Sequence, residues 1–145
     1  MAGHPGAGAV VGEAAIRVRY AETDQMGVVY HSNYLIWFEI GRVELLRQLG
    51  FSYLELERNQ YHLPVVEVRC RYKAPALYDE TLTIRTRISQ LRPSLIQFAY
   101  QAIRQSDGTL LAEGETTHIV LGAEKKKTQL PAKYLEPLRR AMGKS

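Results

Sequence analysis

The segment over residues 31–49 constrains the fold more than any other part of the chain, because its spacing predicts a long helix that is apolar on nearly all sides. The apolar positions are Tyr34, Leu35, Trp37, Phe38, Ile40, Val43, Leu45, Leu46 and Leu49. Such a helix is surrounded by structure rather than lying on a surface. Gly41 lowers the helix propensity by about 1 kcal/mol relative to Ala, so we expect it to let a strand approach closely. Gly50 stands where the helix stops.

Around this helix the pattern changes to the period of two that is typical of half-buried strands. We predict strands over residues 15–20, 66–72, 82–88, 96–102 and 110–121, and short helices over residues 52–59 and 131–142. The four strands after the long helix have short connections, so they must form mainly an antiparallel meander. The fold class is therefore α+β, a curved antiparallel sheet of about five strands wrapped around one long central helix. A sheet edge left unpaired favours dimerisation.

The length of 145 residues suits a single domain with one core. Residues 1–12, which are rich in Gly and Ala, are interpreted as a flexible tail and residues 13–145 as the domain. No apolar run approaches the ~18 residues of a membrane-spanning helix, and the first residues lack the charged and apolar regions of a signal peptide. Because the single Cys70 excludes an internal disulfide, a reducing, cytoplasmic setting is the simplest expectation.

The net charge of +4 favours anionic ligands. It does not choose between nucleic acid, anionic lipid and a phosphorylated cofactor. The chain has no Arg/Lys-rich helix, no Cys/His zinc spacing and no Gly-rich phosphate loop. We therefore expect no bound metal, no nucleic-acid partner and no membrane insertion. The lysine run at residues 125–127 is typical of a solvated loop.

The polar loop between the first strand and the long helix contains the candidate catalytic residues. Asp24 lies in this loop and, taken alone, reads as a loop or helix-capping carboxylate. A carboxylate just before a helix can also act as base or nucleophile, while the free N–H groups of the first helical turn hold a developing oxyanion. A purely structural Asp24 does not explain why Gly27, Tyr30, His31 and Asn33 crowd the same turn.

Four further residues near this helix or in the sheet can be interpreted from the sequence. Gly27 either adopts a positive φ or leaves room for a ligand near the backbone. His31 is either a polar residue satisfied at the helix start or a group that polarises a carbonyl. Arg42 falls among leucines at helical spacing, where an unpaired charge is costly. We therefore expect an acidic partner, such as Glu39 or Glu67, and interpret Arg42 as a structural residue. His118 fits no ligand set and is expected to face a neighbouring chain.

Residues 20–44 resemble the signature of the 4-hydroxybenzoyl-CoA thioesterase family within the hotdog-fold superfamily. The family pattern is roughly Asp-x-x-Gly-x-Val-Tyr-[His or Tyr]-x-x-Tyr, followed by an aromatic residue and an Arg-x-Glu. The matching positions are Asp24, Gly27, Val29, Tyr30, His31, Tyr34, Phe38, Arg42 and Glu44. Residues 63–66, 78–82, 112–114 and 116–118 are also similar to the family. Within it, the chain is most similar to bacterial acyl-CoA thioesterases of the Tol–Pal gene cluster type, in which His commonly follows the Val-Tyr pair.

The resemblance implies a hotdog fold and hydrolysis of an acyl-CoA thioester, or alternatively of an acyl-carrier-protein thioester. Asp24 matches the catalytic carboxylate, which acts as nucleophile or as general base. The backbone N–H of His31 matches the oxyanion donor, and its imidazole positions substrate or water. Tyr30 completes the catalytic candidates. A thioester is already activated, so no metal and no cofactor is expected beyond the CoA of the substrate. A homotetramer is expected by resemblance, with a dimer as the alternative.

The substrate-binding candidates are Gly27, Asn33, Tyr34, Lys73 and Arg92. Arg92, expected in the turn between the third and fourth strands, matches a position near the family's nucleotide site. Pro93 and Ser94 follow it where family members carry several consecutive basic residues. The contacts to the nucleotide of CoA are therefore the weakest part of the resemblance.

Two other classes of function compete with hydrolysis. Enzymes that hydrate or dehydrate acyl-thioesters use the same fold, but they place an Asp and a His in a different motif. A non-catalytic module that binds acyl-CoA fits the basic charge, but Asp24 would then add negative charge to a pocket for anions.

Overall fold

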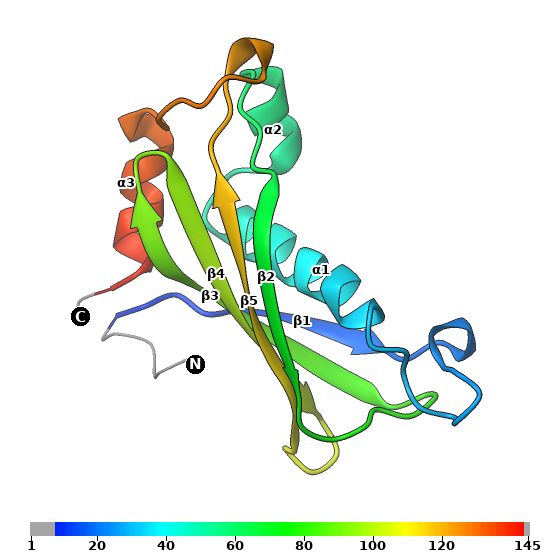
Figure 1. Ribbon diagram of the computed structural model, residues 1–145. Helices are drawn as coiled ribbons and strands as arrows, with labels where there is room; N and C mark the ends of the chain where they lie inside the picture. Colours follow the sequence, from blue (N-terminus) through cyan, green and yellow to red (C-terminus); the bar gives the residue numbers. More distant parts are fainter. Residues whose placement is uncertain (1–7, 144–145) are drawn as a thin grey trace.

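Five strands form one antiparallel sheet that curves around a long helix in the computed structural model, which describes residues 8–143 (Figure 1). The strands are β1 (Gly12–Arg17), β2 (Val65–Tyr72), β3 (Thr81–Arg92), β4 (Leu95–Arg104) and β5 (Leu110–Ile119). The helices are α1 (Asn33–Gln48), α2 (Tyr53–Arg58) and α3 (Ala132–Ala141), with short 3-10 turns η1 (Tyr20–Glu22) and η2 (Ala123–Lys125). The predicted α+β class is confirmed.

The strand order in the sheet is β1-β3-β4-β5-β2. The meander from β3 to β5 matches the prediction, but β2 pairs with β5 instead of β3, so the prediction of four strands in consecutive order is wrong for β2. Residues 73–80 carry the chain from one edge past two strands, about 14 Å at normal strand spacing, which eight residues span easily. A period of two shows which face of a strand is buried, but not which strand lies beside it.

The core lies between α1 and the inner face of the sheet. Burial alternates along β3 as the sequence pattern predicts, and the ring of Phe38 stacks on that of Tyr100 with the centroids 4.4 Å apart. The sequence predicts that structure surrounds α1 on nearly all sides. Within the single chain, only the side of α1 that faces the sheet is covered. Ile36 and Ile40 on its other side are 53% and 39% exposed.

The boundary at the N-terminal end differs from the prediction. Residues 1–7 of the predicted tail lie outside the described residues, whereas the N–H of Val10 donates to the carbonyl of Ala141 and Gly12 opens β1. The strand ends at Arg17, and Tyr20 already belongs to η1. Within residues 8–143, no helix has both the length and the apolar character needed to cross a membrane.

The prediction that His118 faces a neighbouring chain is wrong. Its side chain is fully buried (0% exposed), with Nδ1 2.9 Å from the carbonyl oxygen of Leu63 and Nε2 2.8 Å from Oγ1 of Thr116. The position belongs to the inward-facing set of β5, so the alternation of the strand turns it into the core.

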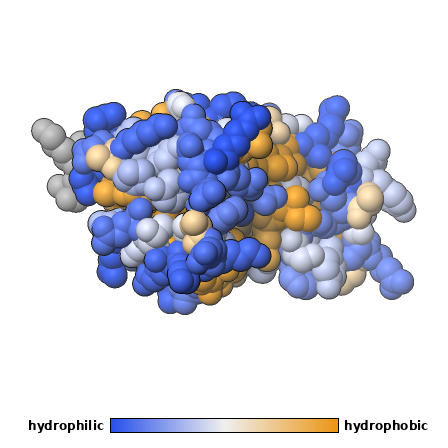
Figure 2. Space-filling model, turned by 90° about the horizontal axis from the view of Figure 1, so that it is seen from above, coloured by the Kyte–Doolittle hydropathy of each residue, from blue (hydrophilic) through white to orange (hydrophobic). Residues whose placement is uncertain are grey.

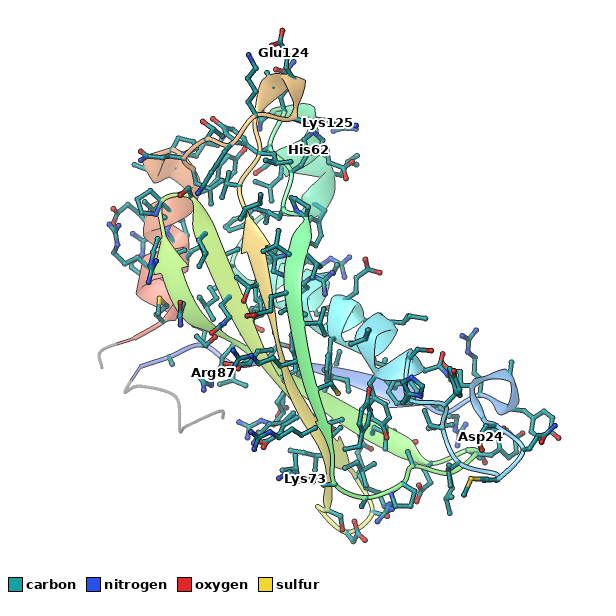
Figure 3. All side chains as sticks on the ribbon, in the orientation of Figure 1. Asp24, His62, Lys73, Arg87, Glu124 and Lys125 are labelled. Atoms are coloured by element: carbon teal, nitrogen blue, oxygen red, sulfur yellow. The ribbon has the colours of Figure 1, made fainter. Side chains whose placement is uncertain are left out.

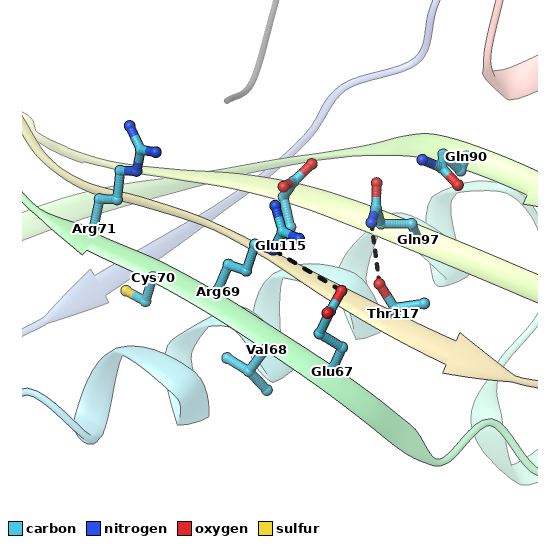
Figure 4. Close-up of a pocket in the computed structure, with 9 residues that line it drawn as sticks. All are labelled: Glu67, Val68, Arg69, Cys70, Arg71, Gln90, Gln97, Glu115 and Thr117. Atoms are coloured by element: carbon cyan, nitrogen blue, oxygen red, sulfur yellow. Dashed lines mark hydrogen bonds and ion pairs between the residues drawn. The ribbon is translucent and has the colours of Figure 1, made fainter.

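A cavity of about 940 Å³ lies on the outer face of the sheet and is lined by side chains of β2, β3, β4 and β5 and by none of the Asp24 loop (Figure 4). Two pairs of its polar side chains interact with each other. Nε2 of Gln97 donates to Oγ1 of Thr117 at 3.0 Å, and Arg69 lies 4.0 Å from Glu67. Size alone therefore does not make this cavity the candidate site.

The contact at Gly41 supports the prediction that a strand approaches α1 closely. A Cβ atom at this position would lie 2.4 Å from Oγ1 of Thr86 and 2.8 Å from Cγ2 of Ile84. We expect Gly41→Ala to lower the free energy of unfolding by about 1–3 kcal/mol, because overpacking outweighs the gain of about 1 kcal/mol in helix propensity. Urea denaturation measures the change, with the exposed Gln48→Ala on the same helix as control. Equal or higher stability of Gly41→Ala would show that β3 yields without cost.

Candidate active site

The Asp24 loop holds its carboxylate by one oxygen. Oδ1 accepts the N–H of Met26 at 2.8 Å and that of Val28 at 3.4 Å, while the backbone of Asp24 pairs with Val28 and Gly27. Oδ2 accepts no hydrogen bond from any residue in the described part of the chain. One oxygen therefore fixes the loop, and the other is available to a substrate or a water.

Gly27 allows this loop to adopt a left-handed backbone conformation. Its φ is +78°, and a Cβ atom there would meet nothing within 4 Å. The positive φ predicted for Gly27 is confirmed, and this conformation costs a glycine little.

The start of α1 presents free N–H groups beside this loop. The helix begins at Asn33, two residues later than predicted. Over residues 8–143, the N–H groups of His31 and Ser32 have no acceptor, and the first turn of α1 carries no acidic side chain. The positive end of the helix is thus open to an oxyanion.

Glu22, which the sequence analysis missed, ties the loop to α1. The side chain of Glu22 is 6% exposed. Oε1 accepts the N–H of Arg19 at 2.7 Å and Oε2 accepts Nε1–H of Trp37 at 3.0 Å. Its carbonyl accepts Nδ2–H of Asn33 at 2.9 Å and the N–H of Tyr30 at 2.8 Å. No local pattern signals this role, since Glu22 and Trp37 are 15 positions apart.

The charge of Glu22 is stabilised where it lies. Burial acts to raise the pKa of this carboxyl, but the hydrogen bonds from the Arg19 backbone and from Trp37, together with the Arg19 guanidinium, lower the pKa below its ordinary value. The residue therefore stays ionised near neutral pH.

A first cavity, of about 670 Å³, is lined by Asp24, which Figure 3 labels in the loop before α1. It brings together three of the predicted site residues, Asp24, Tyr30 and Asn33. The remaining lining residues are Tyr20, Ala21, Thr23 and Gln25. Tyr30 is half exposed, so its hydroxyl is accessible to a bound molecule.

A second cavity, of about 310 Å³, lies on the other side of residues 28–34. It brings together His31, Tyr34 and Lys73. The other lining residues are Val28, Val29, Tyr72, Ala74 and Pro75. Lys73 reaches this place because the crossing segment at residues 73–80 pairs with the loop, through the bridge between residues 28 and 77.

Tyr72 is a second residue that the sequence analysis missed as part of the site. Its hydroxyl donates to the carbonyl oxygen of His31 at 3.0 Å, and its ring lies edge-on to that of Tyr34 at 5.3 Å. Burial raises the pKa of Tyr34 to about 12, so this phenol is neutral and its ring forms an aromatic wall of the cavity. The alternation of β2 placed Tyr72 on an inward face but carried no signal of its contact with His31.

A family model described as the thioesterase-like superfamily matches residues 18–138. The chain belongs to this superfamily. It is 40% identical over 114 residues to a putative acyl-CoA thioesterase, YneP, of Bacillus subtilis, covering 79% of this chain and 82% of that one. It is 38% identical over 100 residues to the acyl-CoA thioester hydrolase YbgC of Escherichia coli, covering 69% and 74%.

Solved structures agree with this assignment. A hypothetical protein, TT1821, of Thermus thermophilus is 38% identical with a TM-score of 0.84, and the match covers 88% of this chain and 97% of that one. A DHNA-CoA thioesterase of Staphylococcus aureus is 31% identical with a TM-score of 0.82, over 90% and 87% of the two chains. The hotdog fold is thereby confirmed, and the protein is a thioester hydrolase.

One predicted residue of this thioesterase-like protein lies far from the others. Arg92 is the last residue of β3 rather than part of the turn. The Asp24 loop packs near the opposite end of that strand, where the N–H of Val18 donates to the carbonyl oxygen of Glu80. Twelve residues of strand extend over roughly 36 Å. Arg92 and Asp24 of one chain therefore do not act on the same atoms.

Proposed function

We propose that this protein hydrolyses an acyl-CoA thioester to the free acid and CoA. Two observations carry the proposal: Asp24 keeps one carboxylate oxygen unengaged, and the N–H groups of His31 and Ser32, which lead into α1, have no acceptor among the described residues. The names of the relatives YneP and YbgC support an acyl-CoA substrate. The finer assignment to the 4-hydroxybenzoyl-CoA thioesterase family and its Tol–Pal type is also part of the proposal, and the sequence of residues 20–44 is what supports it.

Two routes fit a carboxylate and an oxyanion donor. Asp24 either attacks the thioester carbon to give an acyl–Asp anhydride that water opens, or it takes a proton from the water that attacks directly. In both routes the C–S bond breaks, water supplies the new oxygen of the acid, and the thiolate of CoA leaves. The N–H of His31 holds the developing negative charge, a contribution of ~3 kcal/mol. Neither route requires a metal or a cofactor.

The two cavities supply places for the two parts of the substrate. We assign the acyl group to the aromatic cavity beside His31 and Tyr34, and the pantetheine arm to the side of Tyr30 and Asn33. Lys73, whose Nζ lies 3.6 Å from a carboxylate oxygen of Glu113, remains close enough to the aromatic cavity to meet an anion. An acyl-carrier-protein thioester is the second candidate substrate.

A homo-oligomer forms part of the proposal. The described residues leave the outer edge of β2 without a partner strand. Val66 and Val68 on β2 are 54% and 42% exposed, and Ile36 and Ile40 of α1 are also exposed. Hydrophobic surface shows between hydrophilic areas in the view from above (Figure 2). A second copy pairing along β2 would cover such residues, and two such dimers make the proposed tetramer, in which Arg92 of another copy can reach the phosphates of CoA.

A panel of acyl-CoA esters tests the function. We expect release of thiol from benzoyl-CoA, 4-hydroxybenzoyl-CoA or butyryl-CoA in preference to octanoyl-CoA and palmitoyl-CoA, because the aromatic cavity of about 310 Å³ is small. Acetyl-CoA shows whether the smallest acyl group suffices, and hydration of an enoyl-CoA tests the competing reaction. Absence of turnover on every ester would contradict acyl-CoA hydrolysis. The proposed cytoplasmic setting, which the single cysteine supports, matches the location of such substrates.

A further inference from the structure

A separate cavity of about 530 Å³ lies at the C-terminal half of α1, bordered by α2 and by segments around residues 61–64 and 121–125. Figure 3 shows His62 and Lys125, which line it, at the end of the molecule away from Asp24. Arg42, on its floor, follows Asn33 by nine positions, a distance of about 14 Å along the helix axis. The proposed catalytic residues of the same chain take no part in this cavity.

The buried guanidinium of Arg42 is the main feature of the cavity. The side chain is 9% exposed, and Nε donates to the hydroxyl of Tyr53 at 3.0 Å. Of its two predicted acidic partners, Glu39 lies 3.8 Å from Nη2 with its own side chain 62% exposed, and Glu67 pairs with Arg69 instead. A buried cation is costly without a close counter-charge, and solvent screens the one that Glu39 offers.

The lining of the cavity decides which anion suits Arg42. Two cations, Arg42 and Lys125, stand against two carboxylates, Glu39 and Glu57. Because these four charges sum to zero, they do not offset the larger desolvation cost of a dianionic phosphate. A single carboxylate can form two parallel hydrogen bonds with a guanidinium.

The rest of the cavity suits an apolar body. Leu63, Pro64 and Leu121 supply aliphatic walls and Tyr61 an aromatic ring. Pockets of about 300–1,000 Å³ with apolar walls and few polar groups are typical of small-molecule sites. Lys125 lines the cavity from η2, where Glu124 and Lys125 have φ of 60° and 57°, two successive left-handed residues that are not glycine.

We propose that this cavity binds an organic monocarboxylate, with the carboxylate on Arg42 and the apolar body against the segment at residues 61–64. The free acid that hydrolysis releases belongs to this chemical class. That source of the ligand rests on the proposed function, whereas the carboxylate chemistry rests on the cavity alone. The protein therefore has a site for an acid apart from the site that makes it.

Isothermal titration of benzoate and hexanoate into the full protein tests the site. We expect saturable binding of at least one acid, with inorganic phosphate as a probe that does not bind. Arg42→Gln should weaken binding at least ~10-fold, and Lys125→Ala should weaken it several-fold. Lys126→Ala is the matched control, because this neighbouring lysine is 79% exposed and pairs with Glu124.

Further variants distinguish failure of this binding proposal from failure of the proposed hydrolysis. Asp24→Asn should bind the acid as the native protein does, and binding lost in that variant would place the acid in the catalytic cavity and overturn the proposal. Failure of acyl-CoA hydrolysis leaves this binding unaffected. Phosphate binding in place of carboxylate binding, or affinity unchanged in both Arg42→Gln and Lys125→Ala, would also overturn it. If Arg42→Gln does not fold, the difference between Lys125→Ala and Lys126→Ala decides.

Discussion

Asp24→Asn should lower the turnover number on the best acyl-CoA ester by a factor of ~10²–10⁴, the usual contribution of a positioned acid–base group. The oxygen of an amide can still accept the N–H groups of Met26 and Val28, so we expect the loop to keep its shape. The amide cannot take a proton from water or form an anhydride. The loss should therefore fall on kcat, with KM changed little. Thiol release measures both constants.

Asp79→Asn is the matched control for this variant. Asp79 is a loop carboxylate with its side chain 60% exposed, and it pairs with Arg17 instead of lining the Asp24 cavity. Its φ of 69° is one that asparagine tolerates. We expect its kinetic constants to match the native ones. Near-native turnover of Asp24→Asn, with an unchanged circular dichroism spectrum, would remove Asp24 from the proposed mechanism.

The parts of the site that sequence reasoning could predict are those that are close together along the chain. Asp24, Tyr30 and Asn33 share one cavity because one loop and one helix start place them there. Gly41 could be assigned to a helix–strand contact because a glycine inside an apolar helix often marks the close approach of another element. Each of these predictions needed only local geometry.

The parts that the sequence did not reveal depend on pairing between distant segments. Tyr72 meets His31 because β2 joins the far side of the sheet, beside β5, and its end comes back to the start of α1. Glu22 reaches Trp37 through the turn of η1. The periodicity of a strand carries no information about its neighbours, so neither contact could be deduced from spacing.

The cavity at Arg42 is another feature that the sequence could not predict. The sequence correctly marked Arg42 as a charge in an apolar setting and named Glu39 as a partner. It could not show that α2, residues 61–64 and η2 leave open space in front of the guanidinium. A pattern of side chains predicts burial, whereas a cavity results from how the elements fail to fill space.

His118 should make the stability of the fold depend on pH below neutrality. Burial, together with the nearby positive charge of Arg42, lowers the pKa of this imidazole to about 4, although the carbonyl of Leu63 acts in the opposite direction. A carbonyl oxygen can only accept, so Nδ1 carries the proton and Nε2 accepts from the hydroxyl of Thr116 in the neutral ring. A second proton on Nε2 would oppose the latter bond.

The sign of the effect follows from proton uptake. Above pH 6.5, the ordinary pKa of histidine, the ring is neutral in both states. Between that pH and about 4 the unfolded chain binds a proton that the folded chain does not, so the free energy of unfolding falls as the pH falls. The loss between pH 7 and about pH 4.5 should reach about 2–3 kcal/mol from this residue. Glu22, whose pKa is lowered, adds to the loss in the same direction only as the pH falls below the ordinary carboxyl range.

Urea denaturation of the native protein and of His118→Gln, each at pH 7 and at about pH 4.5, isolates this contribution. His118→Gln should be less stable at pH 7, because it disturbs a buried hydrogen-bonded site, but its stability should change with pH by about 2–3 kcal/mol less than that of the native protein. His62→Gln is the control substitution, since His62 is exposed and lies outside the hydrogen bonds of His118 with Leu63 and Thr116. An equal pH dependence in the native protein and in His118→Gln would mean that the buried imidazole accepts its second proton without disturbing the core, and the acid sensitivity would then have to come from the carboxylates.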